Sequence, residues 1–245
     1  MGTVGTVGST PKEVRKAHRL AELTESLRGP LPSACPMDLF SVSVSGSMHP
    51  YEDRVLVEER RGLFAVADGV TGSSQGSGTV AAELALELLQ QCFTGDVVEA
   101  IQEVHQKVVE RRVNDRSIGE TTLTVAAVKG DKLQVGNLGD SPAYLVRNGT
   151  MHSLITEDIT PLGRITQVVG YPENVNVHSQ EMQLCTRDLL IIASDGLEHV
   201  LLPSLIIPLS KESSSRRIAE KIVEEASLVP ANYDDDKSVI VLRID

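Results

Sequence analysis

Three apolar runs of this chain end at an aspartate that lies next to a glycine, and this recurrence limits the possible folds most. The runs are LFAVADG, LQVGNLGDS and LLIIASDG, and their aspartates are Asp68, Asp140 and Asp195. Each run has the length and apolar content of a buried β-strand, and Asp beside Gly commonly forms the turn after a strand. The chain is therefore expected to fold around short buried strands whose ends carry carboxylates.

Two further acidic places stand where strand-like runs begin. Glu52-Asp53 opens the run RVLV, and Asp234-Asp235-Asp236 precedes SVIVLRI. Any one of the five places is explained by an ordinary turn or a solvated loop. If the strand ends share one rim, however, several carboxylates converge and cannot all stay ionised without compensation. An all-oxygen ligand set favours Mg²⁺ or Mn²⁺ over zinc, so the pattern indicates a site for such cations.

The order of the expected elements predicts the architecture. The strand-like runs come in groups and do not alternate strictly with helices, as parallel βαβ units would. Two antiparallel sheets that pack together, with helices on their outer faces, fit this order better, and the predicted fold class is α+β. The expected strands are 40–44, 54–57, 63–67, 121–128, 132–137, 143–146, 151–155, 175–184, 189–193 and 238–244, and the expected helices are 79–92, 97–113 and 216–226.

The N-terminal residues lack the strand-like runs of the rest of the chain and are predicted to form a separate part, 1–37, before a domain at 38–245. A helix is expected near 11–28, because Thr10 is a suitable N-cap, Pro11 takes the first helical position and Gly29-Pro30 supplies a stop. This helix is expected to pack on the main domain, and the alternative is a helix that binds a partner.

Composition excludes several classes of function. The chain has 245 residues, a formal net charge of −11, 3% aromatic residues and no tryptophan, which argues against a nucleic-acid-binding protein. Cys35, Cys92 and Cys185 are scattered and odd in number, so neither a disulfide framework nor a zinc site is expected, and a reducing cytoplasm is the simplest location. No apolar run approaches the ~20 residues of a membrane span.

Seven segments, in order, resemble the metal-dependent protein phosphatases, the protein phosphatase type 2C family, and its short bacterial members in particular. The resemblance implies a four-layer α/β/β/α sandwich and a protein-serine/threonine phosphatase with two Mn²⁺ or Mg²⁺ ions per site and a weaker third. It also implies phosphorylated protein substrates, an opposing Ser/Thr kinase and a monomer. The segments are YED (51–53), FAVADGVTG (64–72), GETTLTVAAV (119–128), LQVGNLGDSPAYLVRNG (133–149), RITQVVG (164–170), LLIIASDGL (189–197) and DDKSVIVLRI (235–244).

The resemblance also implies roles for individual residues. Among the acids before the last strand, Asp235 is chosen because Asp235-Asp236-Lys237-Ser238 is similar to the family's Asp-Asn/Asp-x-Thr/Ser pattern. The implied metal ligands are Asp68, which bridges two ions, the backbone carbonyl of Gly69, Asp195 and Asp235, with Asp140 at a third ion, and the implied catalytic pair is Glu52 and Asp53, which hydrogen-bond to metal-bound water.

Four departures from the family pattern leave an alternative open. Met48 stands where the family has a phosphate-binding arginine, although His49 lies beside it, and Val70 stands where some members have a histidine. His199 replaces an acid after Asp195, and the flap between residues 156 and 163 is much shortened. The alternative function is a catalytically weak relative that serves as a regulatory binding module. The complete set of carboxylates favours the active enzyme, because a binding module has no need of so repulsive a cluster.

Overall fold

The computed structural model describes residues 37–48, 51–70, 76–212, 214–228 and 234–245. The helix expected over residues 11–28 lies outside these ranges, so the division of the chain at residue 37 stays a prediction. Within the described ranges, no helix is long and apolar enough to cross a membrane.

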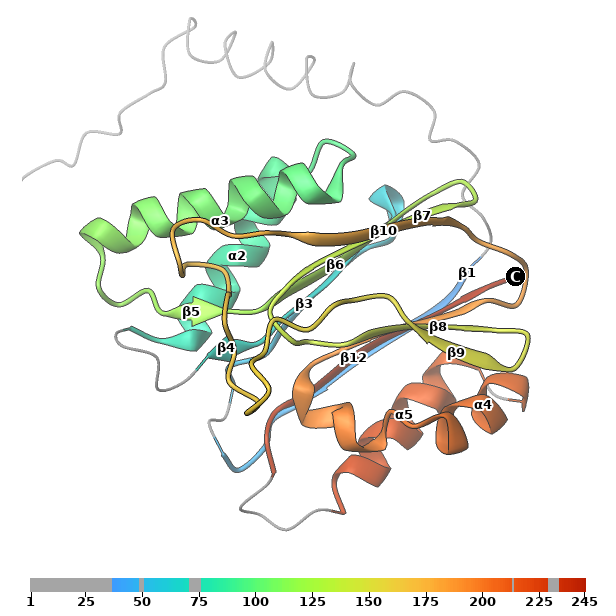
Figure 1. Cartoon of the computed structure of the whole chain (residues 1–245). Helices are drawn as coiled ribbons and strands as arrows, with labels where there is room; N and C mark the ends of the chain where they lie inside the picture. Colours follow the sequence, from blue (N-terminus) through green and yellow to red (C-terminus); the bar gives the residue numbers. More distant parts are fainter. Residues whose placement is uncertain (1–36, 49–50, 71–75, 213, 229–233) are drawn as a thin grey trace, which may run out of the picture. The chain divides into compact units, whose positions relative to one another are not determined.

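Two five-stranded sheets form the centre of the domain, and neighbouring strands within each sheet run antiparallel (Figure 1). The first sheet contains, in spatial order, β1 (Met37–Val44), β12 (Lys237–Ile244), β11 (Leu189–Ala193), β8 (Ala143–Arg147) and β9 (Thr150–Ser153). The second contains β10 (His178–Gln183), β7 (Lys132–Leu138), β6 (Leu123–Lys129), β3 (Leu63–Ala67) and β2 (Arg54–Glu58).

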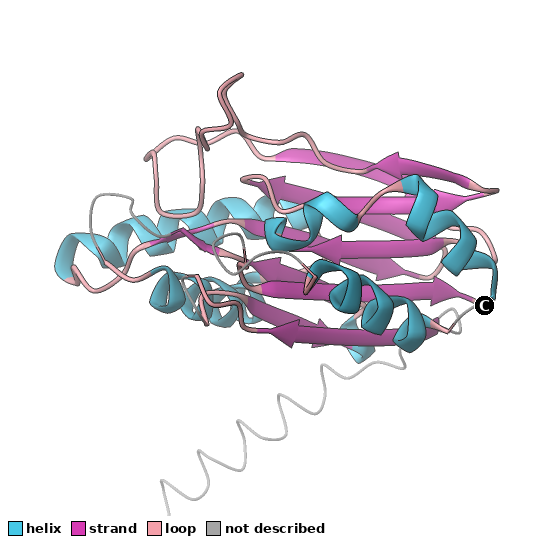
Figure 2. Cartoon of the chain, turned by 90° about the horizontal axis from the view of Figure 1, so that it is seen from below, coloured by secondary structure: helices cyan, strands magenta, loops and turns pink. Residues whose placement is uncertain are grey.

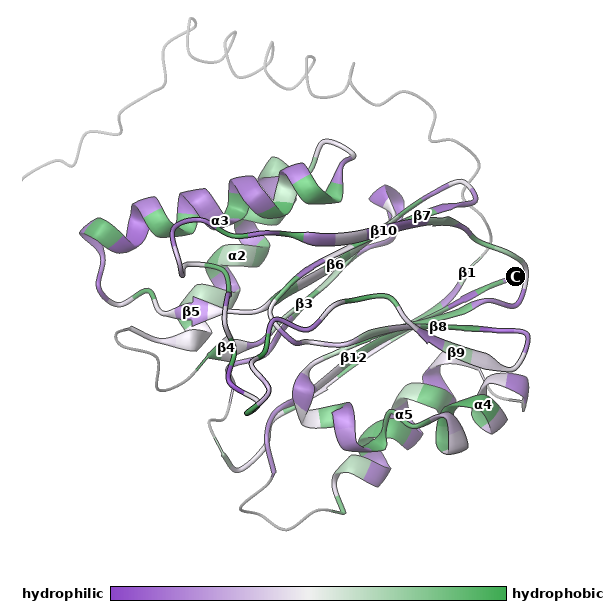
Figure 3. Cartoon of the chain, viewed as in Figure 1, coloured by the Kyte–Doolittle hydropathy of each residue, from purple (hydrophilic) through white to green (hydrophobic). Residues whose placement is uncertain are grey.

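The two sheets pack against each other through their apolar side chains. Phe64 and Val66 of β3 belong to one buried cluster with Ile192 of β11 and Ile240 of β12. Ala65, between them in the sequence, belongs to the cluster on the other face of the sheet, as the alternation of side chains along a strand requires. Figure 3 shows the apolar colour running along these strands. The strands are therefore buried on both faces.

Helices cover the outer face of each sheet (Figures 1 and 2). Helices α2 (Gly78–Cys92) and α3 (Val97–Asn114) share a buried cluster with the second sheet. Helices α4 (Pro203–Glu212) and α5 (Ser215–Ala226) share another with the first sheet. This arrangement is a four-layer α/β/β/α sandwich, so the predicted fold class is confirmed.

Two of the differences between the predicted and the observed elements have a clear physical cause. Helix α4 is not predicted, because Pro208 lies inside it and a proline normally interrupts a helix. The strand predicted over 175–184 is too long, since only β10 pairs with β7. Before β10, the side-chain amide of Gln167 accepts from the N–H of Asn176 at 2.9 Å and donates to its carbonyl at 2.9 Å. A side chain thus takes the hydrogen bonds that a partner strand would have made.

The strand register brings the acidic places to one rim. Arg54 of β2 pairs with Ala67 of β3, so Asp53 and Asp68 are the next residues outward on neighbouring strands. In the first sheet, Ala193 of β11 pairs with Val239 of β12. The segment after β11 therefore lies beside the segment that leads into β12.

Candidate active site

Asp68 follows the fully buried strand β3, and hydrogen bonds hold its backbone on both sides. The Asp68 N–H donates to Oγ1 of Thr122 at 3.0 Å. The Asp68 carbonyl accepts from the Thr122 N–H and from Oγ1 of Thr121, both at 2.8 Å. Thr121 ends the short strand β5 (Glu120–Thr121), which pairs with β4 (Gly69–Val70). The backbone that presents the Asp68 carboxylate is therefore fixed.

Gly69 and Gly78 lie in backbone contact, and this contact requires two glycines. A Cβ on Gly69 would lie 2.4 Å from the carbonyl carbon of Gly78, and a Cβ on Gly78 would lie 2.6 Å from that of Gly69. Gly78 is the first residue of α2, after the N-cap Ser77. The first turn of α2 is thereby placed against the backbone next to Asp68.

Asp53 is buried, and a second strand end fixes its carboxylate. Its Oδ2 accepts from Oγ of Ser194 at 2.6 Å, and that Oγ accepts from the N–H of Ser238 at 3.0 Å. Burial raises the pKa of Asp53 to about 6, against the hydrogen bonds of Ser194 and Ser238, and Asp236 and Asp195 add repulsion. The other oxygen, Oδ1, is buried and has no hydrogen-bond partner among the described residues.

The pKa values of Asp68 and Asp195 depend on each other and on the acids around them. Burial raises the pKa of Asp68 well above its ordinary value, and the carboxylates of Asp53, Asp195 and Asp235 raise it further. The pKa of Asp195 is also raised, first by loss of hydration and then by Asp235 and Glu198, while Asp68 lowers it by a hydrogen bond. The structure thus brings together Asp53 and Asp68 from the second sheet with Asp195 and Asp235 from the first.

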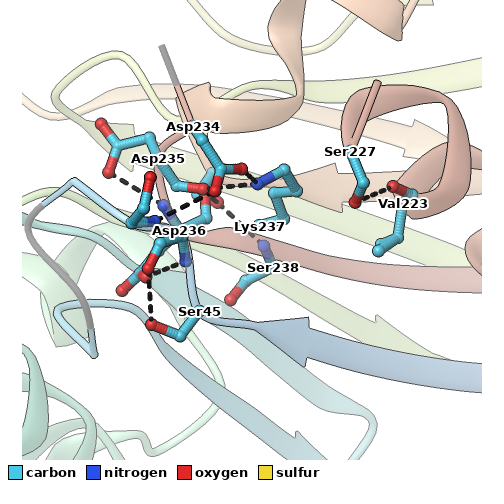
Figure 4. A network of polar contacts seen from close by, with 11 residues as sticks. Ser45, Val223, Ser227, Asp234, Asp235, Asp236, Lys237 and Ser238 are labelled. Atoms are coloured by element: carbon cyan, nitrogen blue, oxygen red, sulfur yellow. Dashed lines mark hydrogen bonds and ion pairs between the residues drawn. The ribbon is translucent and has the colours of Figure 1, made fainter. Parts of the chain in front are cut away.

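The three aspartates before β12 are held in three different ways (Figure 4). Asp234 forms an ion pair with the buried Lys237 and accepts from the N–H of Ser47 at 3.1 Å. Asp236 accepts three backbone N–H groups of residues 46–53. Among the described residues, the Asp235 carboxylate accepts only the N–H of Asp236, at 2.9 Å. Asp235 is therefore the member of the triplet whose carboxylate is least committed.

A second acidic group surrounds Asp140. Burial raises the pKa of Asp140 to about 7, and the carboxylates of Asp195, Glu157 and Glu198 add to the rise. The turn before Asp140 is held by Asp158, whose N–H donates to the Gly139 carbonyl at 3.0 Å and whose Oδ2 accepts from the Gly139 N–H at 2.9 Å. Sequence reasoning missed Glu157 and Glu198. Glu198 lies three residues after the expected ligand Asp195, and Glu157 lies in the shortened flap segment.

The remaining predicted positions differ in their exposure and contacts. Met48 is 38% exposed, lies outside the strands and donates its N–H to the Asp234 carbonyl at 3.0 Å. Glu52 is half-buried and donates its N–H to Asp236 at 2.6 Å. Val70 is half-buried in β4, and His199 is exposed on the 3-10 helix η2 (Asp195–Val200). His49 lies outside the described residues.

The donor set fits divalent cations by its chemistry. It offers carboxylate oxygens, which hard cations prefer, and the buried Oδ1 of Asp53 lacks the partner that a buried polar atom normally has. In the described part of the chain, no three His, Cys, Asp or Glu side chains are already arranged as a group that could hold a metal ion. Asp53, Asp195 and Asp235 are close enough to raise the pKa of Asp68, and ligation requires these side chains to turn toward a shared centre.

Comparisons with known proteins place the chain in a family. A model of the family "Protein phosphatase 2C" matches residues 45–228. The serine/threonine phosphatase stp of Listeria welshimeri is 26% identical over 224 residues, which cover 77% of this chain and 86% of that protein. Because the family model spans about three quarters of the sequence, the chain belongs to the protein phosphatase 2C family.

Solved structures share the architecture. The PPM Ser-Thr phosphatase MsPP from Mycobacterium smegmatis, in complex with cacodylate, is 25% identical with a TM-score of 0.70, over 84% of this chain and 98% of that one. The catalytic domain of the phosphatase PstP, in complex with two manganese ions, is 21% identical with a TM-score of 0.72, over 85% of this chain and 99% of that one. The second likeness concerns the fold alone.

Proposed function

We propose that this protein hydrolyses phosphoserine and phosphothreonine in proteins with the help of divalent cations held at the acidic rim. The observation that supports the proposal most is the convergence of Asp53, Asp68, Asp195 and Asp235 at the strand ends of two sheets, where burial first and neighbouring carboxylates second raise the pKa values of Asp53, Asp68 and Asp195. Such a cluster costs stability unless cations compensate its charge. Membership of the protein phosphatase 2C family fits the same chemistry.

The proposed ligands are Asp68, Asp195 and Asp235, with the carbonyl of Gly69. When bound, a pair of Mn²⁺ or Mg²⁺ ions lowers the pKa of water and neutralises charge on phosphoryl oxygens. Glu52 and Asp53 are proposed to orient water by accepting hydrogen bonds, and the free Oδ1 of Asp53 is suited to that role. Asp140, with Glu157 and Glu198, is proposed to hold a further, weaker cation.

The finer features of the proposal concern the protein's setting. Two ions per site are proposed from the donor set and from the family. An opposing Ser/Thr kinase is proposed because reversible signalling requires one. A monomer and a cytoplasmic location are also proposed, the latter from the few, scattered cysteines.

The experiment that tests the function is a phosphatase assay with metal control. The purified chain should hydrolyse p-nitrophenyl phosphate and a phosphothreonine peptide in Mn²⁺ or Mg²⁺. Excess chelator should abolish turnover, and restored Mn²⁺ should recover it. Full activity in chelator would contradict the proposed cation chemistry. Absence of turnover with every divalent cation would favour the regulatory binding module instead.

A further inference from the structure

One carboxylate holds both ends of the segment that carries the acidic pair. Oδ1 of Asp236 accepts from the N–H of Gly46 at 2.8 Å. Oδ2 accepts from the N–H groups of Glu52 at 2.6 Å and of Asp53 at 3.2 Å. Asp236 is 4% exposed, so these hydrogen bonds are sheltered from water. Both oxygens of the side chain are therefore engaged as acceptors.

Backbone contacts also hold the same segment next to the residues that lead into β12. The Asp234 carbonyl accepts from the N–H groups of Ser47 at 2.9 Å and Met48 at 3.0 Å. A Cβ on Gly46 would lie 2.2 Å from that carbonyl oxygen, so only glycine fits there. The backbone contacts leave the segment little freedom next to Asp236.

The far end of the segment is strained and is held from the opposite side. Tyr51 has a φ of 69°, a conformation that a bulky residue adopts only where its surroundings impose it. Nη1 of Arg54 donates to the carbonyls of Tyr51 at 2.8 Å and Asp53 at 2.7 Å. The Asp236 carboxylate thus accepts hydrogen bonds from the N–H groups of this turn, while the Arg54 guanidinium donates hydrogen bonds to its carbonyls.

The segment matters because it sets where the Asp53 carboxylate lies. Asp236 fixes the Asp53 backbone, and Ser194, next to Asp195, fixes one carboxylate oxygen at 2.6 Å. The remaining oxygen is left without a partner in the described structure. A small shift of the backbone would break the Ser194 contact or move this free oxygen.

We propose that Asp236 is a positioning residue, which places the Glu52-Asp53 pair against the other acids of the site. This role rests on the proposed phosphatase function. The family pattern admits asparagine at this position, but in this chain N–H groups approach both oxygens, an arrangement that suits a carboxylate. An asparagine has one acceptor oxygen, and its NH₂ group would face an N–H.

Asp236→Asn tests the role with a nearly isosteric change, and Asp234→Asn is the matched control in the same triplet. In Asp236→Asn, kcat for p-nitrophenyl phosphate with Mn²⁺ should fall about tenfold or more, since displaced catalytic groups lose rate steeply. The KM should change less than about threefold. Amide hydrogen exchange at Gly46, Glu52 and Asp53 should accelerate in this variant, whereas Asp234→Asn should keep wild-type kcat within about threefold.

Each outcome decides a separate point. Faster exchange with unchanged kcat, or unchanged exchange with lower kcat, would overturn the positioning role. A wild-type protein without turnover would overturn the proposed function, and with it the catalytic purpose of Asp236, whatever the exchange rates show. If Asp236→Asn does not fold, Asp236→Glu keeps the charge and both oxygens but displaces them by one methylene. The same fall in kcat is expected there, and a folded variant with normal kcat would refute the role.

Discussion

The carboxylates at the rim differ in the hydrogen bonds and ion pairs that they already form. This difference separates the proposed cation ligands from the residues that hold the backbone in place. Lys237 engages Asp234, and backbone N–H groups engage Asp236. Asp235 has only its neighbour's N–H among the described residues. Asp235, the member of the triplet that the sequence pattern favours, is therefore the one that we propose as a cation ligand.

Replacement of the proposed ligands should remove turnover without unfolding the chain. Asp68→Ala, Asp195→Ala and Asp235→Ala should each lower kcat by about a hundredfold or more, equivalent to ~3 kcal/mol of transition-state stabilisation. Asp234→Ala is the control and should lose far less. Circular dichroism should confirm the fold of each variant. Normal turnover in Asp235→Ala, with loss in Asp234→Ala, would show that the ligand is assigned one residue too late.

Met48→Arg should improve the binding of small phosphate esters. A guanidinium forms two parallel hydrogen bonds with phosphate, which a thioether cannot make. Met48 is exposed and outside the strands, so the larger side chain has room. We expect KM to fall by about threefold to thirtyfold, for ~1–2 kcal/mol gained, while kcat changes less. Unchanged KM with an unchanged melting temperature would mean that another group already holds the phosphate.

Asp140 should make the chelator-treated protein less stable as the pH rises. Its folded pKa is about 7 against an ordinary 3.8, so the folded state binds the proton more tightly and loses this advantage between about pH 4 and 7. Burial lowers the pKa of His105, which acts in the opposite direction. Asp140→Asn retains His105, so the stability of wild type relative to this variant should decrease from pH 5 to pH 7.5. Denaturant unfolding of both proteins in excess chelator at pH 5 and pH 7.5 measures this difference in stability. If the difference is the same at both pH values, the raised pKa of Asp140 is refuted.

Among the elements, the junction of β4 with α2 has the least room. Because a Cβ on Gly78 would meet the Gly69 backbone at 2.6 Å, Gly78→Ala must move either the helix or the residues after Asp68. We expect a loss of ~1–3 kcal/mol in the free energy of unfolding and a lower kcat. Thr79→Ala, one residue further along the same turn, is the control. Wild-type stability and kcat in Gly78→Ala would show that the contact is dispensable.

Sequence patterns predicted the elements whose signal is local and missed those set by distant contacts. The strands at 63–67 and 189–193 are apolar runs bounded by turns, and both are found within those limits. Helix α4 forms despite Pro208 in its interior and packs on the first sheet. The acidic residues could be recognised in the sequence. No local pattern, however, predicted that Asp236 accepts a hydrogen bond from Gly46, 190 positions earlier.

For the molecule as a whole, bound cations should appear as added stability. The chain carries a net charge of −11, and its most crowded carboxylates lie at one rim. A ligand that binds only the folded state stabilises it by about 2.7 kcal/mol at a hundredfold excess over its Kd. Mn²⁺ should therefore raise the melting temperature of chelator-treated wild type by several degrees, and by much less in Asp68→Ala. Equal shifts in the two proteins would place the binding elsewhere.

Because Asp53 and Asp68 lie just outside strands of one sheet while Asp195 and Asp235 lie just outside strands of the other, an ion shared by them would be a cross-link between the two halves of the sandwich. The affinity of the site for that ion would then depend on how the two sheets pack against each other. A cavity made between the sheets and away from the rim, for example by Leu242→Ala near the far end of β12, would change how the two halves pack and weaken ion binding. Substitutions in the hydrophobic core between the sheets would thus change the cation affinity of this domain without changing a single ligand.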